Sequence, residues 1–472
     1  MMPVYFRELK PYPKEDIKKL IKNDIFEKLL ESKHLSVEND KCKFDFVGII
    51  LLNDHIIRCY PKYMHKESKL DEDYNESTDK NFKETIEKDF NDVMRSIKKY
   101  KKQHEPFQYE NEFLEDVPFN LLSLMLFFIE DYYENGAYSN IRNILEINGN
   151  GAINWDKTIN DSFPLIKNKR PYYMELYTRH KLDDLYNYFR LLHECIITEC
   201  SKRLEEAGLL EIFDLPPVEL SDVELKDFDD ESFILNKLEK ELNLEFNTHK
   251  QKLLKSMHAY VSKENSFNNE NFLTLYGANS YEYVWENMCA EVFNNKLETN
   301  IGKLGLEFKY GCDFNPDVRL IEIVEKPNWV FYEGLSIEKS TLRPDIITFY
   351  EDNFIIFDAK YYDLSFEGDN DFKGPGIDDV TKQYLYQLAY KKFIKRAKFK
   401  GVKNAFLMPT FDSKVKNMGY VELNMLHKLC TGSPKMQLEN IQIILLPARK
   451  INELYLNNED MEDLEFLFHK TK

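Results

Sequence analysis

The sequence lacks several features that mark secreted, membrane-spanning or nucleotide-binding proteins. Its seven cysteines include no C-x-x-C pair, so neither a zinc ribbon nor a disulfide framework is expected, and reduced thiols of a cytoplasmic protein are the simplest account. The longest apolar stretch, residues 121–129, is too short to span a bilayer, and the N-terminus does not resemble a signal peptide. Neither G-x-x-x-x-G-K-[ST] nor G-x-G-x-x-G occurs, so no nucleotide-binding loop is recognisable. We therefore expect no membrane contact and no nucleotide site in this chain.

A net positive charge is also missing. The chain has 64 Lys and Arg against 82 Asp and Glu, which gives a formal net charge of −18. Such an acidic protein is a poor candidate for tight DNA binding on its own, because the phosphate backbone repels it. Any contact with DNA would have to come from a local basic patch or from a partner protein.

The 472 residues are enough for roughly two to four domains, and their patterning predicts a multidomain protein of the α+β and α/β classes. Residues 1–106 are expected to form a small N-terminal α+β domain followed by a charged linker. Residues 107–270 are expected to be mostly helical and to dock a partner. Residues 271–472 show a helix, strand, strand, helix, strand order, which predicts a mixed sheet flanked by helices.

Apolar periodicity and turn signals place the individual elements. The charged residues 65–106 read as the linker or as exposed helices, and residues 146–159 read as a turn that joins two short strands, with Trp155 as a core anchor. Asp378 is a candidate N-cap for the helix that follows it. Helices are expected at residues 14–30, 107–135, 181–209, 231–260, 281–296 and 379–398, and strands at residues 46–52, 55–60, 405–408 and 441–446.

Two carboxylates and a lysine lie on a predicted β-hairpin. Residues 344–360 read as two strands, rich in β-branched and aromatic side chains, around a short polar turn. A hairpin centred on Glu351-Asp352 places Asp345 directly opposite Asp358, with the two Cβ atoms about 5 Å apart. Lys360 then points to the same face as Asp358, because the strand period is 2. A slip of one residue would put the aspartates on opposite faces.

This arrangement would be costly for a purely structural hairpin. Like charges directly opposite each other destabilise a sheet, and two carboxylates among apolar neighbours raise one another's pKa unless a cation joins them. Mg²⁺ or Mn²⁺ would resolve the conflict, because both ions prefer oxygen ligands. Lys360 would then be placed to orient or activate water, or to stabilise charge on a phosphate. The alternative is a solvated hairpin end with chance charges.

The P-D pair followed by D-x-K resembles the signature of the PD-(D/E)-x-K nuclease superfamily. The resemblance implies a nuclease fold with a metal held by Asp345 and Asp358. It further implies that the backbone carbonyl of Ala359 completes the inner ligand shell and that Lys360 is the catalytic lysine. The helix before the hairpin often adds a glutamate to the metal site, and Glu286 is the expected one here.

The resemblance implies one further site residue from the helix before the hairpin and one from the helix after it. Among Glu282, Glu286 and Glu291, we favour Glu286 because it follows a core-facing tryptophan. Many nucleases of the superfamily carry a Gln, often with a Tyr, on the helix after the D-x-K strand. Gln383 is the expected match, with Tyr386 one turn further along the same face.

A basic stretch follows on the same helix and continues to Lys403 without an acidic residue. It could be the solvated end of a helix, favoured by the helix dipole. It could equally contact the phosphate backbone of DNA beside the cleavage site. The residues expected to bind DNA are Lys382, Lys391, Lys392, Lys395 and Arg396.

Most of the chain resembles a narrower group, the McrC-like subunits of LlaJI-type restriction systems. The matching segments are residues 46–50, residues 60–63, residues 148–159 and the C-terminal nuclease motif. The resemblance implies a partner, an AAA+ GTPase similar to McrB, which forms a ring, binds double-stranded DNA and translocates it. The McrC-like chain would dock on that ring, stimulate GTP hydrolysis and cut DNA, so GTP would act only through the partner. Residues Trp155, Asp156 and Lys157 could touch the ring.

Three functions remain open from the sequence. The favoured one is a metal-dependent endonuclease subunit of a restriction or phage-defence complex, with dimerisation through the nuclease domain as a further expectation. The second is a self-sufficient nuclease, which the long N-terminal extension disfavours. The third is a non-catalytic adaptor that activates a partner NTPase, which the intact Asp345, Asp358 and Lys360 disfavour.

Overall fold

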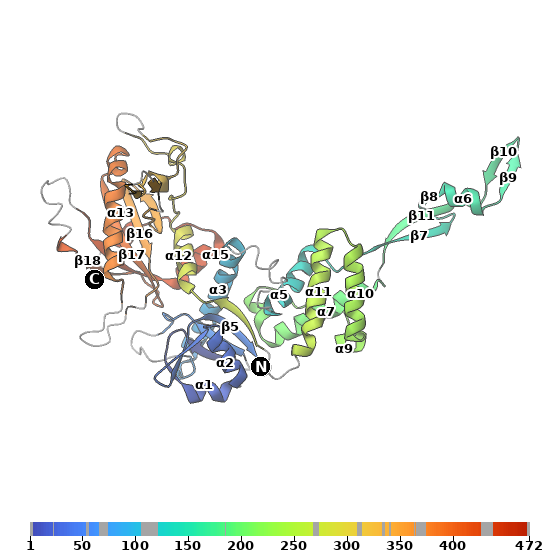
Figure 1. Ribbon diagram of the computed structural model, residues 1–472, viewed down its shortest axis with the longest axis horizontal. Coiled ribbons are helices and arrows are strands. Elements are labelled where there is room, and N and C mark those ends of the chain that lie inside the picture. Colours follow the sequence, from blue (N-terminus) through green and yellow to red (C-terminus); the bar gives the residue numbers. More distant parts are fainter. Residues whose placement is uncertain are drawn as a thin grey trace. The chain divides into compact units, whose positions relative to one another are not determined.

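The chain folds into two compact units (Figure 1). Residues 2–106 and 275–472 together form one, here called the split unit, and residues 107–274 form the other, the inserted unit. The three-part division expected from the sequence therefore differs from the observed one, because the N-terminal and C-terminal regions share a single unit. A computed structural model describes residues 3–469 except 22, 53–55, 66–73, 105–120, 185, 268–272, 309–313, 333–335, 339–340, 363, 365–373 and 426–437.

The N-terminal part of the split unit contains two small sheets and two helices. The four-stranded sheet has the order β1-β6-β5-β12, and the three-stranded sheet has the order β2-β4-β3. The predicted hairpin strands are confirmed, since β5 and β6 pair antiparallel, whereas their turn at Asn53-Asp54 lies outside the described residues. The elements are β1 (Pro3–Arg7), β2 (Tyr12–Pro13), α1 (Lys14–Leu20), α2 (Asn23–Glu31), β3 (Leu35–Glu38), β4 (Lys41–Phe44), β5 (Val47–Leu52), β6 (Ile56–Tyr60) and β12 (Leu273–Ala278).

Two local details concern the break in the expected helix and the packing of a strand. The single helix expected at residues 14–30 is two helices, because Ile21 adopts an extended conformation that ends α1. Gly48 lies where β5 passes close to β12, and a Cβ atom there would collide with the backbone oxygen of Tyr276. The glycine therefore permits the close approach of the two strands.

The region expected to be a charged linker is in fact a packed helix, α3 (Lys80–His104). Its buried residues recur at helical spacing, and they include Phe82, Ile86, Phe90, Val93 and Ile97. This apolar stripe packs against two helices of the C-terminal part, α12 (Tyr281–Val292) and α15 (Ala448–Asn457). The linker prediction is therefore wrong, because the high charge belongs to the solvent-facing side of an amphipathic helix.

Polar contacts reinforce the packing of α3. The Arg449 guanidinium donates to both carboxylate oxygens of Asp89, at 2.7 and 2.9 Å. Ser96 Oγ donates to Asn452 Oδ1 at 2.7 Å, and both residues are buried. These contacts join a segment near residue 90 to a segment near residue 450, which is why the two ends of the chain belong to one unit.

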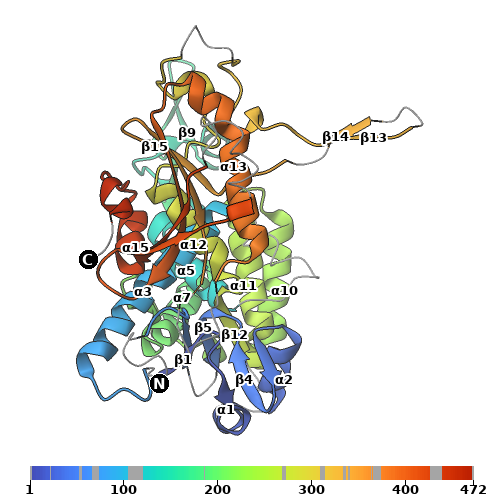
Figure 2. The same ribbon diagram turned by 90° about the vertical axis from the view of Figure 1, so that its left-hand side faces the viewer.

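The C-terminal part of the split unit is built on a five-stranded sheet with the order β15-β16-β17-β19-β18. The pairs β16/β17 and β17/β19 are parallel, and the pairs β15/β16 and β18/β19 are antiparallel, so the mixed sheet is confirmed. The strands are β15 (Ile346–Tyr350), β16 (Asn353–Ala359), β17 (Gly401–Thr410), β18 (Lys416–Val421) and β19 (Ile441–Pro447). Besides α12 and α15, the surrounding elements are α13 (Ile377–Arg396), η1 (Ile301–Lys303), η2 (Leu320–Ile323), η3 (Glu465–Phe468), β13 (Asn328–Val330) and β14 (Ser336–Glu338). The last two pair as a hairpin that projects from the rest of the unit (Figure 2).

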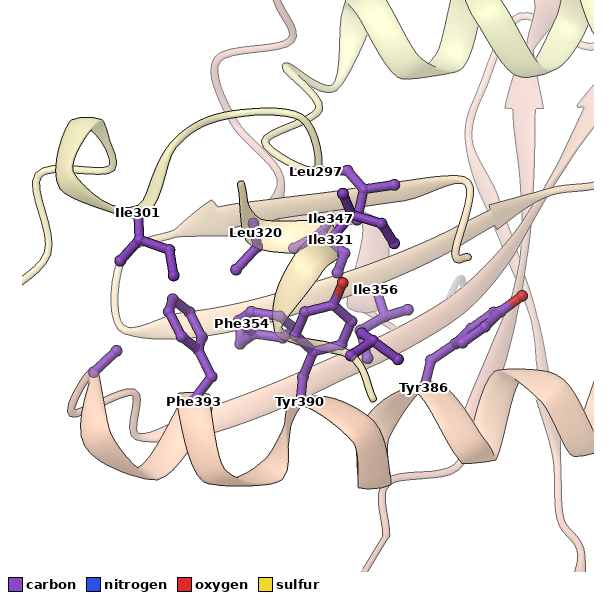
Figure 3. Close-up of a cluster of buried hydrophobic side chains, with 12 residues drawn as sticks. Leu297, Ile301, Leu320, Ile321, Ile347, Phe354, Ile356, Tyr386, Tyr390 and Phe393 are labelled. Carbon is purple, nitrogen blue, oxygen red and sulfur yellow. The ribbon is translucent and has the colours of Figure 1, made fainter. Parts of the chain in front are cut away.

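Helix α13 covers one face of this sheet, and a large apolar cluster fills the space between them (Figure 3). Tyr386, Tyr390 and Phe393 of α13 contact the buried Phe354 and Ile356 of β16 within this cluster. The helix begins at Ile377, two residues earlier than expected. Gly376 is its N-cap and donates its backbone N–H to Asp379 Oδ2 at 3.3 Å, so Asp378 lies in the first turn instead of capping it.

The inserted unit consists of a helical body and a β arm that extends from it (Figure 1). The body is helical as expected, but the helix expected from residue 181 begins at residue 188, because residues 181–183 belong to a strand, and the helix expected at residues 231–260 is two helices. The arm was anticipated only as two short strands. No described helix is both long enough and apolar enough to cross a membrane. The body contains α5 (Leu121–Asn135), α7 (Tyr188–Glu206), α8 (Leu209–Ile212), α9 (Leu225–Phe228), α10 (Glu231–Leu244) and α11 (Thr248–Phe267), and the arm contains β7 (Ile141–Ile147), β8 (Ala152–Ile153), α6 (Trp155–Asp161), β9 (Pro164–Lys167), β10 (Arg170–Tyr173) and β11 (Tyr177–Asp183).

Candidate active site

The predicted register of the β15–β16 hairpin is confirmed. Ile346 pairs with Phe357, and Tyr350 pairs with Asn353 across the turn. Asp345 directly precedes β15 and Asp358 directly follows Phe357, so continuing this register by one residue places Asp345 opposite Asp358. Asp345 Oδ2 accepts a hydrogen bond from the backbone N–H of Ala359 at 2.9 Å, which fixes its carboxylate against the D-x-K segment.

An asparagine that the sequence did not point to holds Asp345 in place. Asn295 follows α12, and its side-chain amide donates to the backbone oxygen of Asp345 at 2.8 Å. Its Oδ1 atom accepts from the backbone N–H of Ile347 at 3.0 Å. On the other side, the Tyr386 hydroxyl donates to the backbone oxygen of Arg343 at 2.9 Å. The chain entering β15 is therefore fixed by side chains from two helical regions.

Lys360 lies between two carboxylates. Its Nζ atom is 3.1 Å from Asp358 Oδ2 and 3.1 Å from Asp379 Oδ1. The Asp358 side chain is 7% exposed and that of Lys360 is 20% exposed, so this ion pair is largely shielded from water. Asp379 lies in the first turn of α13 and was not predicted as a site residue. An acidic residue at the start of the helix that follows the D-x-K strand was the available signal.

The electrostatics of the cluster depart from those of ordinary surface groups. Burial raises the pKa of Asp345 to about 9, with a further rise from the hydrogen bond and charge of Asp358. Burial likewise raises the pKa of Glu286 to about 7. For Lys360, burial acts to lower the pKa, but the neighbouring carboxylates, Asp358 foremost, raise it overall. Lys360 is therefore a permanent ammonium at neutral pH, whereas Asp345 holds a proton unless a cation takes its place.

The donor set suits a magnesium-like ion. Two opposed carboxylates, one of which needs a proton to remain buried, form a site that a divalent cation can occupy in place of that proton. Mg²⁺ commonly uses one or two carboxylates and takes its other ligands from water or substrate. Across the described residues, no three Asp, Glu, His or Cys side chains gather closely enough to form a metal site. The protein's side-chain ligands would thus be Asp345 and Asp358.

Glu286 and Gln383 occupy different positions relative to this cluster. Glu286 is half-buried, and the charges of Lys360 and Asp358 influence its pKa, so it lies near the cluster as expected. Gln383 is fully buried between α13 and the sheet, where its Nε2 atom donates to Asn404 Oδ1 at 2.6 Å. The amide of Gln383 is therefore committed to the helix–sheet interface, beside the backbone oxygen of Ile356 at 3.4 Å.

Most of the basic stretch lies far from the cluster along α13. With a rise of about 1.5 Å per residue, Lys391 lies about 18 Å beyond Asp379, whereas Lys382 is only about 5 Å beyond it. Exposed positions include Lys382, Lys391, Lys392 and Lys395. Of the expected DNA-binding residues, Lys382 is thus the one that α13 brings nearest to the aspartates.

A second candidate site is the arm of the inserted unit, residues 141–183. Residues of segment 148–159, one of those behind the family resemblance, build its structure: Asn154 caps α6 by accepting from the Lys157 backbone N–H at 3.2 Å, and Thr158 Oγ1 accepts from the Tyr177 backbone N–H at 3.0 Å. Trp155 does not anchor a core, because it is 54% exposed, so that prediction is wrong.

The arm exposes an unusual number of apolar side chains. Phe163 is 96% exposed and Ile166 is 69% exposed. Large exposed apolar side chains gathered in one small segment are typical of a surface that a partner covers. The other exposed apolar side chains of the arm are Leu145, Ile147, Ile153, Trp155, Ile159, Leu165, Tyr172 and Met174.

Comparison with known proteins connects these sites to a family. The chain is 28% identical over 469 residues to the "Type II restriction enzyme BsuMI component YdjA" of Bacillus subtilis (strain 168), covering 96% of this chain and 90% of the relative. A solved half-complex from a tetradecameric assembly of Thermococcus gammatolerans McrB AAA+ hexamers with bound McrC is similar with a TM-score of 0.38 and 11% identity, over 97% of this chain and 100% of that one. The LlaJI restriction endonuclease family matches residues 46–305 and 311–449. The chain belongs to the LlaJI restriction endonuclease family.

Proposed function

We propose that this chain is the DNA-cleaving subunit of a GTPase-driven restriction or phage-defence complex, and that it hydrolyses phosphodiester bonds at Asp345, Asp358 and Lys360. The observation that carries the proposal is the side-chain interaction of Asp345 with the buried Asp358, beside a lysine ammonium 3.1 Å from Asp358. The mixed sheet, with this cluster at one end of its hairpin, agrees with the PD-(D/E)-x-K nuclease fold. Membership of a restriction endonuclease family supports the same chemistry.

The residues have distinct roles in the proposed reaction. Asp345 and Asp358 would hold Mg²⁺ or Mn²⁺ with the Ala359 carbonyl as a further ligand, and Glu286 would lie beside them. When bound, such an ion lowers the pKa of a coordinated water and neutralises charge on the phosphate. Lys360, held by Asp358 and Asp379, would stabilise the negative charge that develops on the phosphate in the transition state.

The same proposal assigns the arm to the partner. An AAA+ GTPase would supply DNA binding and movement, and it would consume the GTP for which this chain has no loop of its own. The exposed apolar side chains of residues 141–183, Trp155 among them, would contact that partner, with Lys157 as a neighbouring cation. The net charge of −18 agrees with a nuclease that relies on a partner for most of its affinity for double-stranded DNA.

The test is cleavage of plasmid DNA by the purified chain with Mg²⁺, with and without the neighbouring GTPase and GTP, beside Asp358→Ala. Cleavage only in the complete mixture, lost in the variant while stimulation of GTP hydrolysis persists, is the expected result. Cleavage by the chain and metal alone would instead indicate a self-sufficient nuclease. An absence of cleavage in every mixture, with GTPase stimulation unchanged by the substitution, would overturn the catalytic assignment in favour of an adaptor.

A further inference from the structure

A buried carboxylate of the N-terminal part contacts the residue that follows Lys360. Glu8 lies just after β1, and its Oε2 atom accepts a hydrogen bond from the Tyr361 hydroxyl at 2.5 Å. The backbone N–H of Lys62 also donates to this oxygen, at 3.2 Å. The contact thus joins two residues that are 353 positions apart in the sequence.

The segment Tyr60-Pro61-Lys62-Tyr63, one of those behind the family resemblance, surrounds this contact. The Lys62 ammonium lies 4.1 Å from the centre of the Tyr361 ring, in a cation–π arrangement. The Tyr63 ring packs edge-on against that of Tyr361, with centroids 6.2 Å apart. Tyr281, at the start of the helix that carries Glu286, packs on Tyr361 at 5.2 Å. One tyrosine therefore connects the N-terminal segment, α12 and the D-x-K strand.

The buried charge of Glu8 calls for an explanation, because an ionised carboxylate in an apolar setting is costly unless it is well paired. Glu8 is 7% exposed and Tyr361 is 8% exposed. Burial raises the pKa of Glu8, while Lys62 and the Tyr361 hydrogen bond lower it in part. An apolar pair of similar size would pack at less cost, so a purely structural role explains the contact poorly.

The neighbouring backbone shows what the contact can control. Lys360 donates its backbone N–H to the oxygen of Leu407 at 2.8 Å, which is the last ladder bond of β16 beside β17. Beyond it the strand ends, and the Tyr361 side chain is held by Tyr63, Tyr281 and Lys62 around its ring and by Glu8 at its hydroxyl. Rotation of the Lys360 backbone would move its ammonium away from Asp358, and a fixed Tyr361 beside it would limit that rotation.

We propose that Glu8 and Tyr361 are positioning residues for Lys360, so that the N-terminal part of the chain completes the nuclease site. The inference rests on the proposed function, because it concerns the same cluster of Asp345, Asp358 and Lys360. It also assigns a task to the Tyr60–Tyr63 segment, which holds the Glu8–Tyr361 contact from the side of β6.

The experiment measures DNA cleavage by the full chain with its GTPase partner, GTP and Mg²⁺, comparing Tyr361→Phe, Glu8→Gln and the double variant. Tyr361→Phe should lower kcat by about tenfold and leave KM for DNA unchanged, because the hydroxyl's bond to Glu8 and the bond it accepts from the Lys62 backbone N–H are both lost. Glu8→Gln keeps an acceptor of the same size without the charge and should cause a smaller loss. The double variant should be no slower than Tyr361→Phe, because both changes act through one contact.

Tyr74→Phe is the matched control. The Tyr74 hydroxyl donates to Glu87 at 2.6 Å, which is a hydroxyl–carboxylate bond in the same N-terminal part but away from the D-x-K strand. This variant should have a comparable loss in Tm and wild-type cleavage. Wild-type kcat in Tyr361→Phe, or an equal loss in Tyr74→Phe, would overturn the inference while leaving the nuclease assignment intact, provided that Asp358→Ala abolishes cleavage. No cleavage by the wild type would overturn both.

Discussion

The end of the β15–β16 hairpin and the arm of the inserted unit depart from the usual distribution of side chains in opposite directions. At the hairpin, charged groups are buried: Asp358 is 5% exposed, and its closest cation is a partly buried lysine. On the arm, apolar groups are exposed: Phe163 is 96% and Ile166 is 69% exposed. Folded proteins ordinarily bury the second kind and expose the first.

Under the proposed function, the difference corresponds to two tasks kept in separate parts of the chain. Burying like charges destabilises the fold but strengthens every electrostatic interaction at the site, which benefits the hydrolysis of a charged substrate. Exposing apolar side chains gains nothing for the isolated chain but supplies the area that a partner can cover. Substitutions at one site should therefore leave the other function intact, and this independence can be tested.

The largest expected effect is at Lys360. Lys360→Met should lower the rate of DNA cleavage by about 10²–10³-fold, because it removes the ammonium that stabilises charge on the phosphate. GTPase stimulation by the arm should remain at the wild-type level in the same preparation. Lys400→Met is the matched control, since Lys400 pairs with Asp352 at the opposite, solvent-exposed end of the hairpin. Equal loss in both variants would mean that the hairpin's stability, and not the site, was affected.

The next effect concerns the arm. Leu165→Asp together with Ile166→Asp should weaken binding to the GTPase by about 10–100-fold, because it places charge on surface that the partner would cover. The folded chain should keep its Tm, since both side chains are exposed. Phe246→Asp is the control, as Phe246 is 91% exposed in the same unit but outside the arm. Normal GTPase stimulation by the arm variant would remove the arm from the proposed interface.

The hairpin could be predicted because its register depends only on residues that are close together in the sequence. A strand period of 2 and a polar turn fix the register, so Asp345, Asp358 and Lys360 could be placed on one patch from the sequence. The groups that support them could not. Asn295 and Asp379 reach the cluster from segments about 50 and 20 residues away in sequence, and no periodic pattern records such contacts.

Two larger prediction errors concern the charged region 65–106 and Trp155, where one feature of the sequence hid another. The charge of residues 65–106 suggested a linker, although Phe82, Ile86 and Phe90 already showed helical spacing. Trp155 suggested a core, because tryptophans are buried on average, yet none of the apolar side chains described in the arm is buried. Gly151, in the same segment, permits close strand packing within the arm, because a Cβ atom there would collide with the backbone of Arg179.

A smaller effect is expected at the carboxylate that shares Lys360. Asp379→Asn should lower cleavage by up to about tenfold, because Lys360 would keep Asp358 but lose its second charged partner. Asp378→Asn, an exposed neighbour in the same helical turn, controls for the loss of negative charge near the N-terminus of α13. If the two variants behaved alike, the helix and not the lysine contact would explain the change.

The smallest expected effect is on the thermal stability of the metal-free chain, measured without DNA or partner. The folded pKa of Asp345 is raised to about 9 from an ordinary value of 3.8, so between these values the folded state keeps a proton that the unfolded chain releases. Stability is therefore highest below this window and falls as pH rises through it. Asp345→Asn removes this pH-dependent loss of stability. The Tm of the variant should therefore exceed that of the wild type by an amount that grows from pH 5 to pH 8, at about 2–4 °C per kcal/mol of unfolding free energy.

Mg²⁺ should raise the Tm of the wild type at pH 8 but not that of the variant, whereas an exposed-site control, Asp317→Asn, should respond as the wild type does. A Tm difference that is independent of both pH and Mg²⁺ would show that ionisation of Asp345 does not destabilise the fold. That result would contradict the proposed metal site, which rests on this destabilisation.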